Sequence, residues 1–178
     1  AGDMDCDGRE ELAVSFVGKG LYVWDEARGY AQISETVSQH LVPLPATPTP
    51  DELVVDFGPD HGLHRYDDAG GWTPLNSVSP IMTVALDMDY DGKHELVSAY
   101  EGHGLYIWDA ERGYKSINSV VPDGMLALNR DLAVDFGSSH GLYRYNSDIG
   151  WKRLSKADPA VMAPVDMNRD GTDELAVG

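Results

Sequence analysis

Short apolar runs alternate with glycine-rich or acidic turns along the whole chain. Five of these runs begin at a leucine, and they recur about every 40 residues. Each of the first four is followed by a Gly-Leu segment and then by a glycine paired with an aromatic residue. Short runs rich in β-branched and aromatic residues and bounded by turn residues predict β-strands. The five runs start at Leu12, Leu53, Leu96, Leu132 and Leu175.

A further apolar run, such as residues 82–86, precedes most of the leucine runs, so each repeat holds four predicted strands. Four short strands in about 40 residues match one blade of a β-propeller. A helical alternative is excluded because no apolar pattern of period 3.6 continues through the glycines. We therefore predict an all-β chain, a β-propeller of four-stranded antiparallel blades. The predicted blades cover residues 1–39, 40–79, 80–120 and 121–157, with a partial repeat at 158–178.

The predicted strands overhang at both ends, giving about four blades and incomplete repeats beside them. Propellers have about 4–8 blades, and closure of the ring protects the strand edges. We expect either a segment of a larger propeller that further chain completes, or a ring completed by homo-oligomerisation. A four-bladed monomer closed by its C-terminal strands is the other arrangement. The total blade number and the oligomeric state stay open.

Three acidic loops with the pattern D-x-D/N-x-D-G-x-x-E stand directly before leucine runs. Oxygen side chains at alternate positions, a glycine for the turn and a closing carboxylate are typical of calcium loops. The closing glutamate stands at position 9 of each loop, whereas in an EF-hand it stands at position 12. A shorter loop that leads straight into a strand is therefore expected. The predicted side-chain ligands are Asp3, Asp5, Asp7 and Glu11 in loop 1 (residues 3–11), Asp87, Asp89, Asp91 and Glu95 in loop 2 (87–95), and Asp166, Asn168, Asp170 and Glu174 in loop 3 (166–174).

This combination of loop and strand resembles the FG-GAP/VCBS repeat of integrin-like β-propellers. The likeness lies in the ligand residues above and in the loop glycines Gly8, Gly92 and Gly171, and it extends over the chain as repeats. In that family the loop joins the first and second strands of a blade and holds Ca²⁺ on one face of the disc. The resemblance implies up to three Ca²⁺ sites. Two departures are the closing glutamate, where aspartate is usual, and the repeats that lack a complete loop.

On this resemblance, Arg9, Lys93 and Thr172 contribute backbone carbonyl oxygens at position 7 of their loops. Loop 3 has one charge fewer because of Asn168, and it lies close to the C-terminus, where fraying weakens binding. We expect it to be the weakest of the three sites. The alternative for all three loops is an Asx-rich turn without metal.

Repeats two and four have shortened loops with too few oxygen side chains to surround a cation. Their leucine runs carry Asp56 and Asp135 where the other repeats carry serine. The strands that follow carry Arg65 and Arg144 where the others carry an aliphatic residue. Counting outwards from the centres of the two hairpins places each aspartate opposite its arginine. We therefore predict the cross-strand ion pairs Asp56–Arg65 and Asp135–Arg144.

Composition narrows the class of partner. The net charge of −17 argues against nucleic acid and anionic membranes as partners. No apolar run approaches the ~18 residues of a spanning helix, so membrane insertion is not expected. No signal peptide is visible in this chain, yet sites that millimolar calcium keeps filled indicate a secreted, extracellular or periplasmic location. The single cysteine, Cys6, excludes an internal disulfide, and its role stays open.

Candidate chemistry outside the loops is sparse, and we predict no catalytic residue. Lys19, His61, His103 and His140 share one place before the Gly-Leu segment, which would set them on the face opposite the loops. They are candidate ligand contacts, the alternative being polar residues that precede a turn glycine. The acidic hairpins after the Gly-Leu strands of repeats one and three are expected to be solvated turns.

Three functions fit these observations. The first is a non-catalytic extracellular recognition module that binds a glycan or protein ligand, as in carbohydrate binding or cell adhesion. The second is the propeller domain of a polysaccharide-degrading enzyme, and the third is a purely structural repeat array. A glycoside hydrolase needs two carboxylates that converge at a cleft, and the clustered carboxylates of this sequence all belong to the metal loops. The first function is therefore preferred, and the identity of the ligand stays open.

Overall fold

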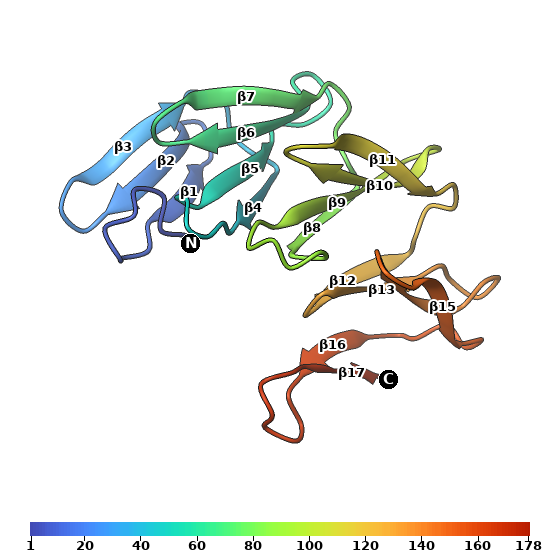
Figure 1. The fold of residues 1–178 in the computed structure, drawn as a ribbon. Helices are drawn as coiled ribbons and strands as arrows, with labels where there is room; N and C mark the ends of the chain where they lie inside the picture. Colours follow the sequence, from blue (N-terminus) through green and yellow to red (C-terminus); the bar gives the residue numbers. More distant parts are fainter. The chain divides into compact units, whose positions relative to one another are not determined.

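The computed structural model describes residues 1–178, which contain seventeen β-strands and no helix. The strands form five antiparallel sheets of two to four strands (Figure 1). The prediction of an all-β chain is confirmed. No helical segment is present that is long and apolar enough to cross a membrane. The chain divides into two compact units, Ala1–Pro80 and Ile81–Gly178, which are described separately.

Unit 1 (Ala1–Pro80) contains a three-stranded sheet and a four-stranded sheet. In both sheets each strand pairs with the strand that follows it in the chain, so each sheet is a meander. The first sheet comprises β1 (Leu12–Phe16), β2 (Gly20–Asp25) and β3 (Gly29–Ser34), and the second comprises β4 (His40–Leu44), β5 (Glu52–Asp56), β6 (Leu63–Asp67) and β7 (Gly71–Asn76).

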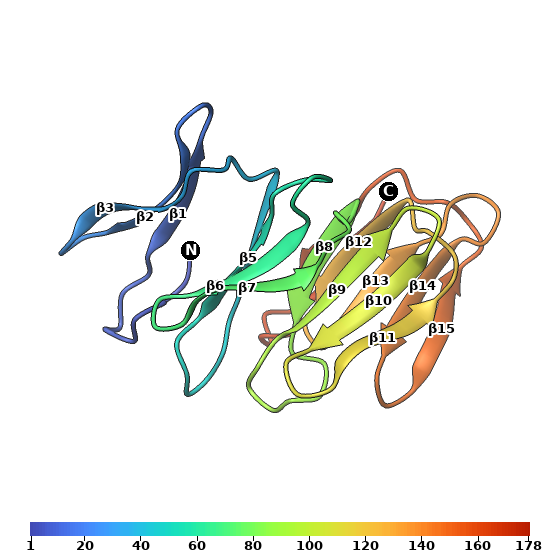
Figure 2. The same cartoon turned by 90° about the horizontal axis from the view of Figure 1, so that it is seen from above.

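Unit 2 (Ile81–Gly178) contains two four-stranded meanders and a two-stranded sheet. The first strands of its successive sheets are neighbours, because β12 packs beside both β8 and β16; Figure 2 shows β8 and β12 side by side. The sheets comprise β8 (Met82–Leu86), β9 (Glu95–Tyr100), β10 (Gly104–Asp109) and β11 (Gly113–Asn118); β12 (Gly124–Leu128), β13 (Asp131–Asp135), β14 (Leu142–Asn146) and β15 (Gly150–Ser155); and β16 (Met162–Val165) and β17 (Glu174–Val177).

Only glycine fits sterically at the start of each Gly-Leu segment, and Gly104 is an example. This residue has a φ of +86°, and an added Cβ would overlap the carbonyl oxygen of Asn118. The close approach accompanies a β-bulge between β10 and β11 at Leu105 and Tyr106. A side chain would therefore be both strained and obstructed at this position. The same bulge recurs between β2 and β3, between β6 and β7 and between β14 and β15, which explains why the Gly-Leu pair repeats.

The core of each unit lies between its sheets. In unit 1, Leu21 and Val23 of β2 pack with Leu53 and Val55 of β5. In unit 2, residues of β9 and β10 pack in the same way with residues of β13 and β14. Strand β9 is buried along its whole length, because its two faces are covered. Strands covered on both faces read as continuous apolar runs, which is the pattern seen at each leucine run.

Leu132 on β13 is fully buried in the core of unit 2. Replacing it with alanine is expected to lower the free energy of unfolding by about 2–5 kcal/mol, because apolar contacts are lost and a cavity is left. Urea unfolding of the two proteins measures the difference. Leu154→Ala on the exposed part of β15 is the matched control, and its expected effect is within about 0.5 kcal/mol. Equal losses in the two variants would contradict the assignment of Leu132 to the core.

The predicted ion pairs Asp56–Arg65 and Asp135–Arg144 are wrong in their register. Arg65 lies opposite Val54, and its Nη1 is 3.2 Å from the carboxylate of Glu52. In the equivalent hairpin of unit 2, Arg144 lies opposite Ala133, and its Nη1 is 3.3 Å from Asp131. Each arginine therefore pairs with the acid at the start of the second strand, where the shortened loop ends.

The turn between β5 and β6 explains this error. The backbone N–H of Phe57 donates to the carbonyl of Gly62 at 3.0 Å, so these two residues close the turn. The centre of the hairpin therefore lies one residue earlier than the count from the sequence placed it, and Asp56 faces Leu63. The Asp56 carboxylate instead accepts hydrogen bonds from the N–H of Gly58 (2.9 Å) and the hydroxyl of Ser79 (2.7 Å).

Candidate metal centres

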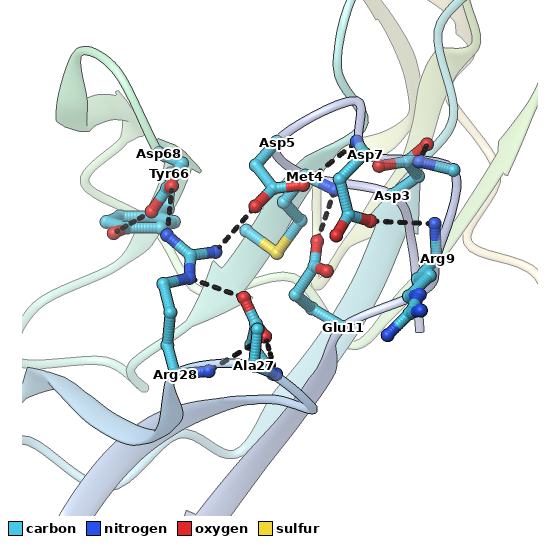
Figure 3. Close-up of polar contacts among 12 residues, drawn as sticks. Asp3, Met4, Asp5, Asp7, Arg9, Glu11, Ala27, Arg28, Tyr66 and Asp68 are labelled. Carbon is cyan, nitrogen blue, oxygen red and sulfur yellow. Dashed lines mark hydrogen bonds and ion pairs between the residues drawn. The ribbon is translucent and has the colours of Figure 1, made fainter.

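Loop 1 is closed by an antiparallel bridge between Gly2 and Glu11, the residue that directly precedes β1. Between these ends the carboxylates of Asp3, Asp5 and Glu11 converge, with one oxygen of each within 4.8 Å of the others (Figure 3). Ca²⁺ takes oxygen ligands at about 2.3–2.6 Å. Three oxygens this close together can therefore bind one cation, and we call this set triad 1.

Backbone hydrogen bonds to side chains hold loop 1 in this shape. The N–H of Met4 donates to Glu11 Oε2 at 2.6 Å, and the N–H of Gly8 donates to Asp3 Oδ2 at 3.1 Å. The N–H of Asp7 donates to Asp5 Oδ1 at 3.1 Å. Side chains of this type stabilise tight turns by bonding to the backbone a few residues away. The spacing of the acids thus shapes the loop as well as bringing the oxygens together.

Loop 2, which joins β8 to β9 in the other unit, repeats this arrangement. Asp87, Asp89 and Glu95 form triad 2, again with one oxygen of each within 4.8 Å of the others. The N–H of Met88 donates to Glu95 Oε2 at 2.7 Å, and the N–H of Gly92 donates to Asp87 Oδ2 at 3.2 Å. Because the two loops lie in different units, the same geometry arises twice from the same local sequence.

One oxygen of each triad has no protein partner. Asp3 Oδ1 and Asp87 Oδ1 are buried and accept no hydrogen bond, although the other oxygen of each carboxylate accepts one from the loop glycine. A buried carboxylate oxygen without a partner is costly, and such atoms are rare in native proteins. A cation bound by the triad would satisfy this oxygen. The residues present therefore fit a hard divalent cation.

The electrostatics of the loops also favour a cation. Glu95 is only 6% exposed, and burial raises its pKa to about 7. The neighbouring charges of Asp89, Asp109 and Asp87 add to this rise, which the hydrogen bond from the Met88 N–H partly offsets. Burial likewise raises the pKa of Glu11, with smaller contributions from nearby aspartates. A bound divalent cation would offset both the burial and the repulsion between like charges.

The triads contain some of the predicted ligands but not all. Asp7 and Asp91 lie outside the converging sets, and their carboxylates accept hydrogen bonds from the N–H groups of Arg9 (2.9 Å) and Lys93 (2.8 Å). The side chains of Arg9 and Lys93 form exposed ion pairs with Glu26 and Glu111 at 2.8 and 3.0 Å. Backbone carbonyl ligation by the residues at position 7 stays a prediction.

Loop 3 has the same hydrogen bonds from backbone N–H groups to carboxylates as loops 1 and 2, but it has an amide side chain at its centre. The N–H of Gly171 donates to Asp166 Oδ2, and the N–H of Met167 donates to Glu174 Oε2, both at 2.9 Å. The Asn168 amide donates to Asp170 Oδ2 and Glu174 Oε1, both at 3.0 Å. A neutral amide that bonds to carboxylates stands here in place of the second aspartate of the other loops. The expectation that loop 3 is the weakest calcium site, with Thr172 contributing a carbonyl, stays a prediction.

A cavity lies beside each triad, and residues of the triad form part of its wall. A cavity of about 360 Å³ beside loop 1 has Met4, Asp5 and Asp68 in its wall. A smaller one of about 90 Å³ beside loop 2 is lined in part by Asp89 and Glu95. Asp5 of triad 1 and Asp89 and Glu95 of triad 2 therefore border on free space.

Two arginines that the sequence analysis did not single out contact the triads. Arg28, in the turn between β2 and β3, places Nη2 at 2.9 Å from Asp5 Oδ2 (Figure 3). Arg112, in the turn between β10 and β11, forms the equivalent ion pair with Asp89. These hairpins are largely exposed, as expected, but their first residues, Asp25 and Asp109, are buried, and both arginines pair with loop carboxylates. The available signal was the pattern Asp-x-x-Arg, which occurs in these turns only in repeats one and three.

The shortened loops contact the complete ones. Asp51, before β5, accepts a hydrogen bond from the N–H of Asp3 at 3.0 Å. In unit 2 the guanidinium of Arg130 lies 4.2 Å from the centre of the Tyr90 ring in loop 2. A repeat that has lost its own acidic loop thus supports the loop of its neighbour.

Lys19, His61, His103 and His140 are exposed and lie in the turns between β1 and β2, β5 and β6, β9 and β10, and β13 and β14. Each turn is at the opposite end of its preceding strand from the complete or shortened loop. The backbone N–H of each residue donates to a carbonyl of its own turn. Their predicted role as ligand contacts stays a prediction. Cys6, at the tip of loop 1, is an exposed free thiol.

The sequence matches no protein-family model, and no curated protein sequence matches it. The resemblance to the FG-GAP/VCBS repeat therefore stays a resemblance of loop motifs and their spacing. Fold alone does not determine function. The two triads and the sheets that carry them are therefore the features that bear on function.

Proposed function

We propose that this chain is a calcium-stabilised β-propeller segment that acts as a non-catalytic recognition module outside the cell. The observation that carries the proposal is the triad of converging carboxylates, which occurs twice with a buried, unpartnered oxygen at Asp3 and at Asp87. Ca²⁺ is bound by several oxygen ligands in flexible geometry, and carboxylates are its usual charged ligands. The ligands of loop 1 would be Asp3, Asp5 and Glu11, and those of loop 2 would be their counterparts.

The sheet architecture supports the propeller part of the proposal. Three sheets are four-stranded meanders, and in unit 2 the first strands of consecutive sheets are neighbours. Blades of a propeller are four-stranded sheets arranged around a central axis. A cation in loop 2 would hold the connection between β8 and β9, the first and second strands of one such sheet.

The recognition part of the proposal rests on the surfaces that the calcium loops leave available for a ligand. If calcium secures one end of the sheets that carry complete loops, other surfaces are free to bind a glycan or a protein. Tyr30 on β3 and Trp24 on β2 are exposed aromatic side chains, a residue type that combines apolar contact area with a polar group. Extracellular calcium at millimolar concentration would fill sites with a Kd of about 10⁻⁴–10⁻³ M.

Calorimetric titration of the metal-free chain with CaCl₂ tests the calcium assignment. We expect binding to at least the two triads with a Kd of about 1 mM or below, and weaker binding of Mg²⁺, which demands near-octahedral geometry. No heat and no shift in melting temperature at millimolar Ca²⁺ would contradict it. A glycan and protein array probed in Ca²⁺ and in EDTA tests recognition, and hydrolysis of a polysaccharide by the chain would contradict the non-catalytic role.

A further inference from the structure

We propose that Arg28 and Arg112 are positioning residues for the two candidate calcium sites. Each guanidinium holds the second aspartate of its loop, Asp5 or Asp89, in the orientation that completes the triad. Neither arginine would touch the cation, and each would act through the carboxylate it contacts. The inference rests on the proposed function, because it assigns a role toward the cation of the same sites.

The contacts of Arg28 anchor it at several points. Its Nε donates to the buried carboxylate of Asp25, its Nη2 to Asp5 at 2.9 Å and its Nη1 to Asp68 at 3.1 Å. Asp25 is fixed in turn by the backbone N–H groups of Ala27 and Arg28, at 2.5 and 3.1 Å. The planar guanidinium is therefore held by a rigid turn and presents a fixed donor to the ligand carboxylate.

Arg112 repeats the contacts with the turn aspartate and the loop aspartate in the other unit. Its Nε donates to Asp109 Oδ2 at 2.6 Å, and its Nη2 donates to Asp89. The N–H groups of Glu111 and Arg112 hold the Asp109 carboxylate at 2.6 and 2.9 Å. The same bridge from a buried turn aspartate, through arginine, to a ligand aspartate is thus built twice.

The bridge leaves the ligand aspartate able to bind a cation. Asp5 accepts one hydrogen bond at Oδ1 from the Asp7 N–H and one at Oδ2 from Arg28. A carboxylate offers about four lone-pair sites, so further acceptor capacity remains at both oxygens. Outer hydrogen bonds of this kind orient metal-ligating carboxylates, and their loss typically weakens metal binding by about 10–100-fold.

The repeats with shortened loops show that the turn itself does not need the arginine. The corresponding turn positions there hold Gly70 and Ile149. In both cases the turn still forms with a hydrogen bond to its first side chain: the N–H of Gly70 donates to Asp67 Oδ1, and the N–H of Asp148 donates to Asn146 Oδ1. The arginine is present where a triad is present and absent where the loop is shortened. The arginine therefore occurs together with the loop aspartate that it contacts.

A guanidinium beside the site also repels Ca²⁺, and this effect acts in the opposite direction. The side chains of Arg28 and Arg112 are 51% and 65% exposed. Water and salt screen the repulsion between exposed charges, whereas the hydrogen bond to the ligand carboxylate is direct. We therefore expect orientation to outweigh repulsion, so that loss of the arginine weakens calcium binding.

The test compares calcium affinities of full-length variants in a background in which Glu11→Gln and Glu174→Gln disable loops 1 and 3. Arg112→Met is expected to raise the calorimetric Kd of loop 2 for Ca²⁺ about 10-fold. Arg112→Lys keeps the charge but lacks the planar fork, and its Kd is expected to rise as well. An unchanged or lower Kd for Arg112→Met, or full recovery of affinity in Arg112→Lys, would overturn the proposal.

Arg130→Met is the matched control, because it removes the same charge beside the same loop without touching a ligand carboxylate. Loss of charge alone should leave the Kd unchanged or lower it. If Arg130→Met raised the Kd as much as Arg112→Met, the effect would not come from the contact with Asp89, and the proposal would fall.

A double-mutant cycle separates positioning from a merely structural role. Asp89→Asn should weaken calcium binding, and adding Arg112→Met to it should weaken binding no further if the arginine acts through Asp89. Effects that multiply would overturn the proposal. The melting temperature of each variant in EDTA reports structural losses, such as those at Asp109, separately from affinity. If the unsubstituted chain itself bound no Ca²⁺, the proposed function would fail; binding that Arg112→Met leaves unchanged would overturn this inference alone.

Discussion

Removal of calcium is expected to lower the free energy of unfolding of each unit by about 2.7 kcal/mol when the site had been held at 100 times its Kd. Units 1 and 2 each contain one complete triad, so both should respond. A change of 1 kcal/mol shifts the melting temperature by about 4–8 °C in units of this size. We therefore expect the melting temperature in EDTA to be lower by about 11–22 °C than in saturating CaCl₂, as measured by calorimetry or circular dichroism.

The control for this experiment must separate specific binding from charge screening. With a net charge of −17, the chain repels itself, and any salt that screens this repulsion stabilises it to some extent. Sodium chloride at matched ionic strength and MgCl₂ at matched concentration report this general effect. If either salt raised the melting temperature as much as CaCl₂, the triads would not be calcium sites.

Glu95→Gln should separate the calcium-dependent part of the stability from the rest. The amide keeps an oxygen in the place of Glu95 Oε2, which accepts the Met88 N–H at 2.7 Å. It removes a buried charge that Asp89, Asp109 and Asp87 repel. In EDTA the variant is therefore expected to be at least as stable as the unsubstituted chain. In saturating CaCl₂ it should lack the increment of about 2.7 kcal/mol that loop 2 contributes.

Urea unfolding of both proteins with and without calcium measures these two differences. Glu101→Gln, in the exposed turn after β9, makes the same change in charge away from the triad and should leave the calcium increment intact. A full calcium increment in Glu95→Gln would show that Glu95 is not a ligand. A large loss of stability of Glu95→Gln in EDTA would show that the charge of Glu95 stabilises the metal-free fold.

The strands and loops of this chain were predictable from local sequence. An Asx side chain bonds to backbone two to five residues away, as in loops 1 and 2, so the spacing of the aspartates and the glycine already specifies the turn. The leucine runs of β5, β9 and β13 are largely apolar because both faces of these strands are buried. Repetition of the leucine runs every 40 residues or so, with a complete loop in every second repeat, predicted the meander sheets.

The register of the hairpins in repeats two and four was not predictable by counting. It depends on whether Gly62 belongs to the turn or pairs with Phe57, and the structure shows the pairing. A change in the closing residue moves every cross-strand partner, so Arg65 meets Glu52 instead of Asp56. Hairpin register follows from turn geometry, which a symmetric count around the turn residues does not capture.

The sequence by itself determined the all-β class, the repeat and the acids that converge in loops 1 and 2, because each of these depends on residues close together in the chain. Only the tertiary structure decided that Asp3 Oδ1 and Asp87 Oδ1 are buried without a partner and that Arg28 and Arg112 reach the ligand aspartates. The arginine contacts join a loop to the hairpin turn of its sheet, and the two contacting residues are separated by 23 residues. Such contacts form only once β1–β3 and β8–β11 have assembled.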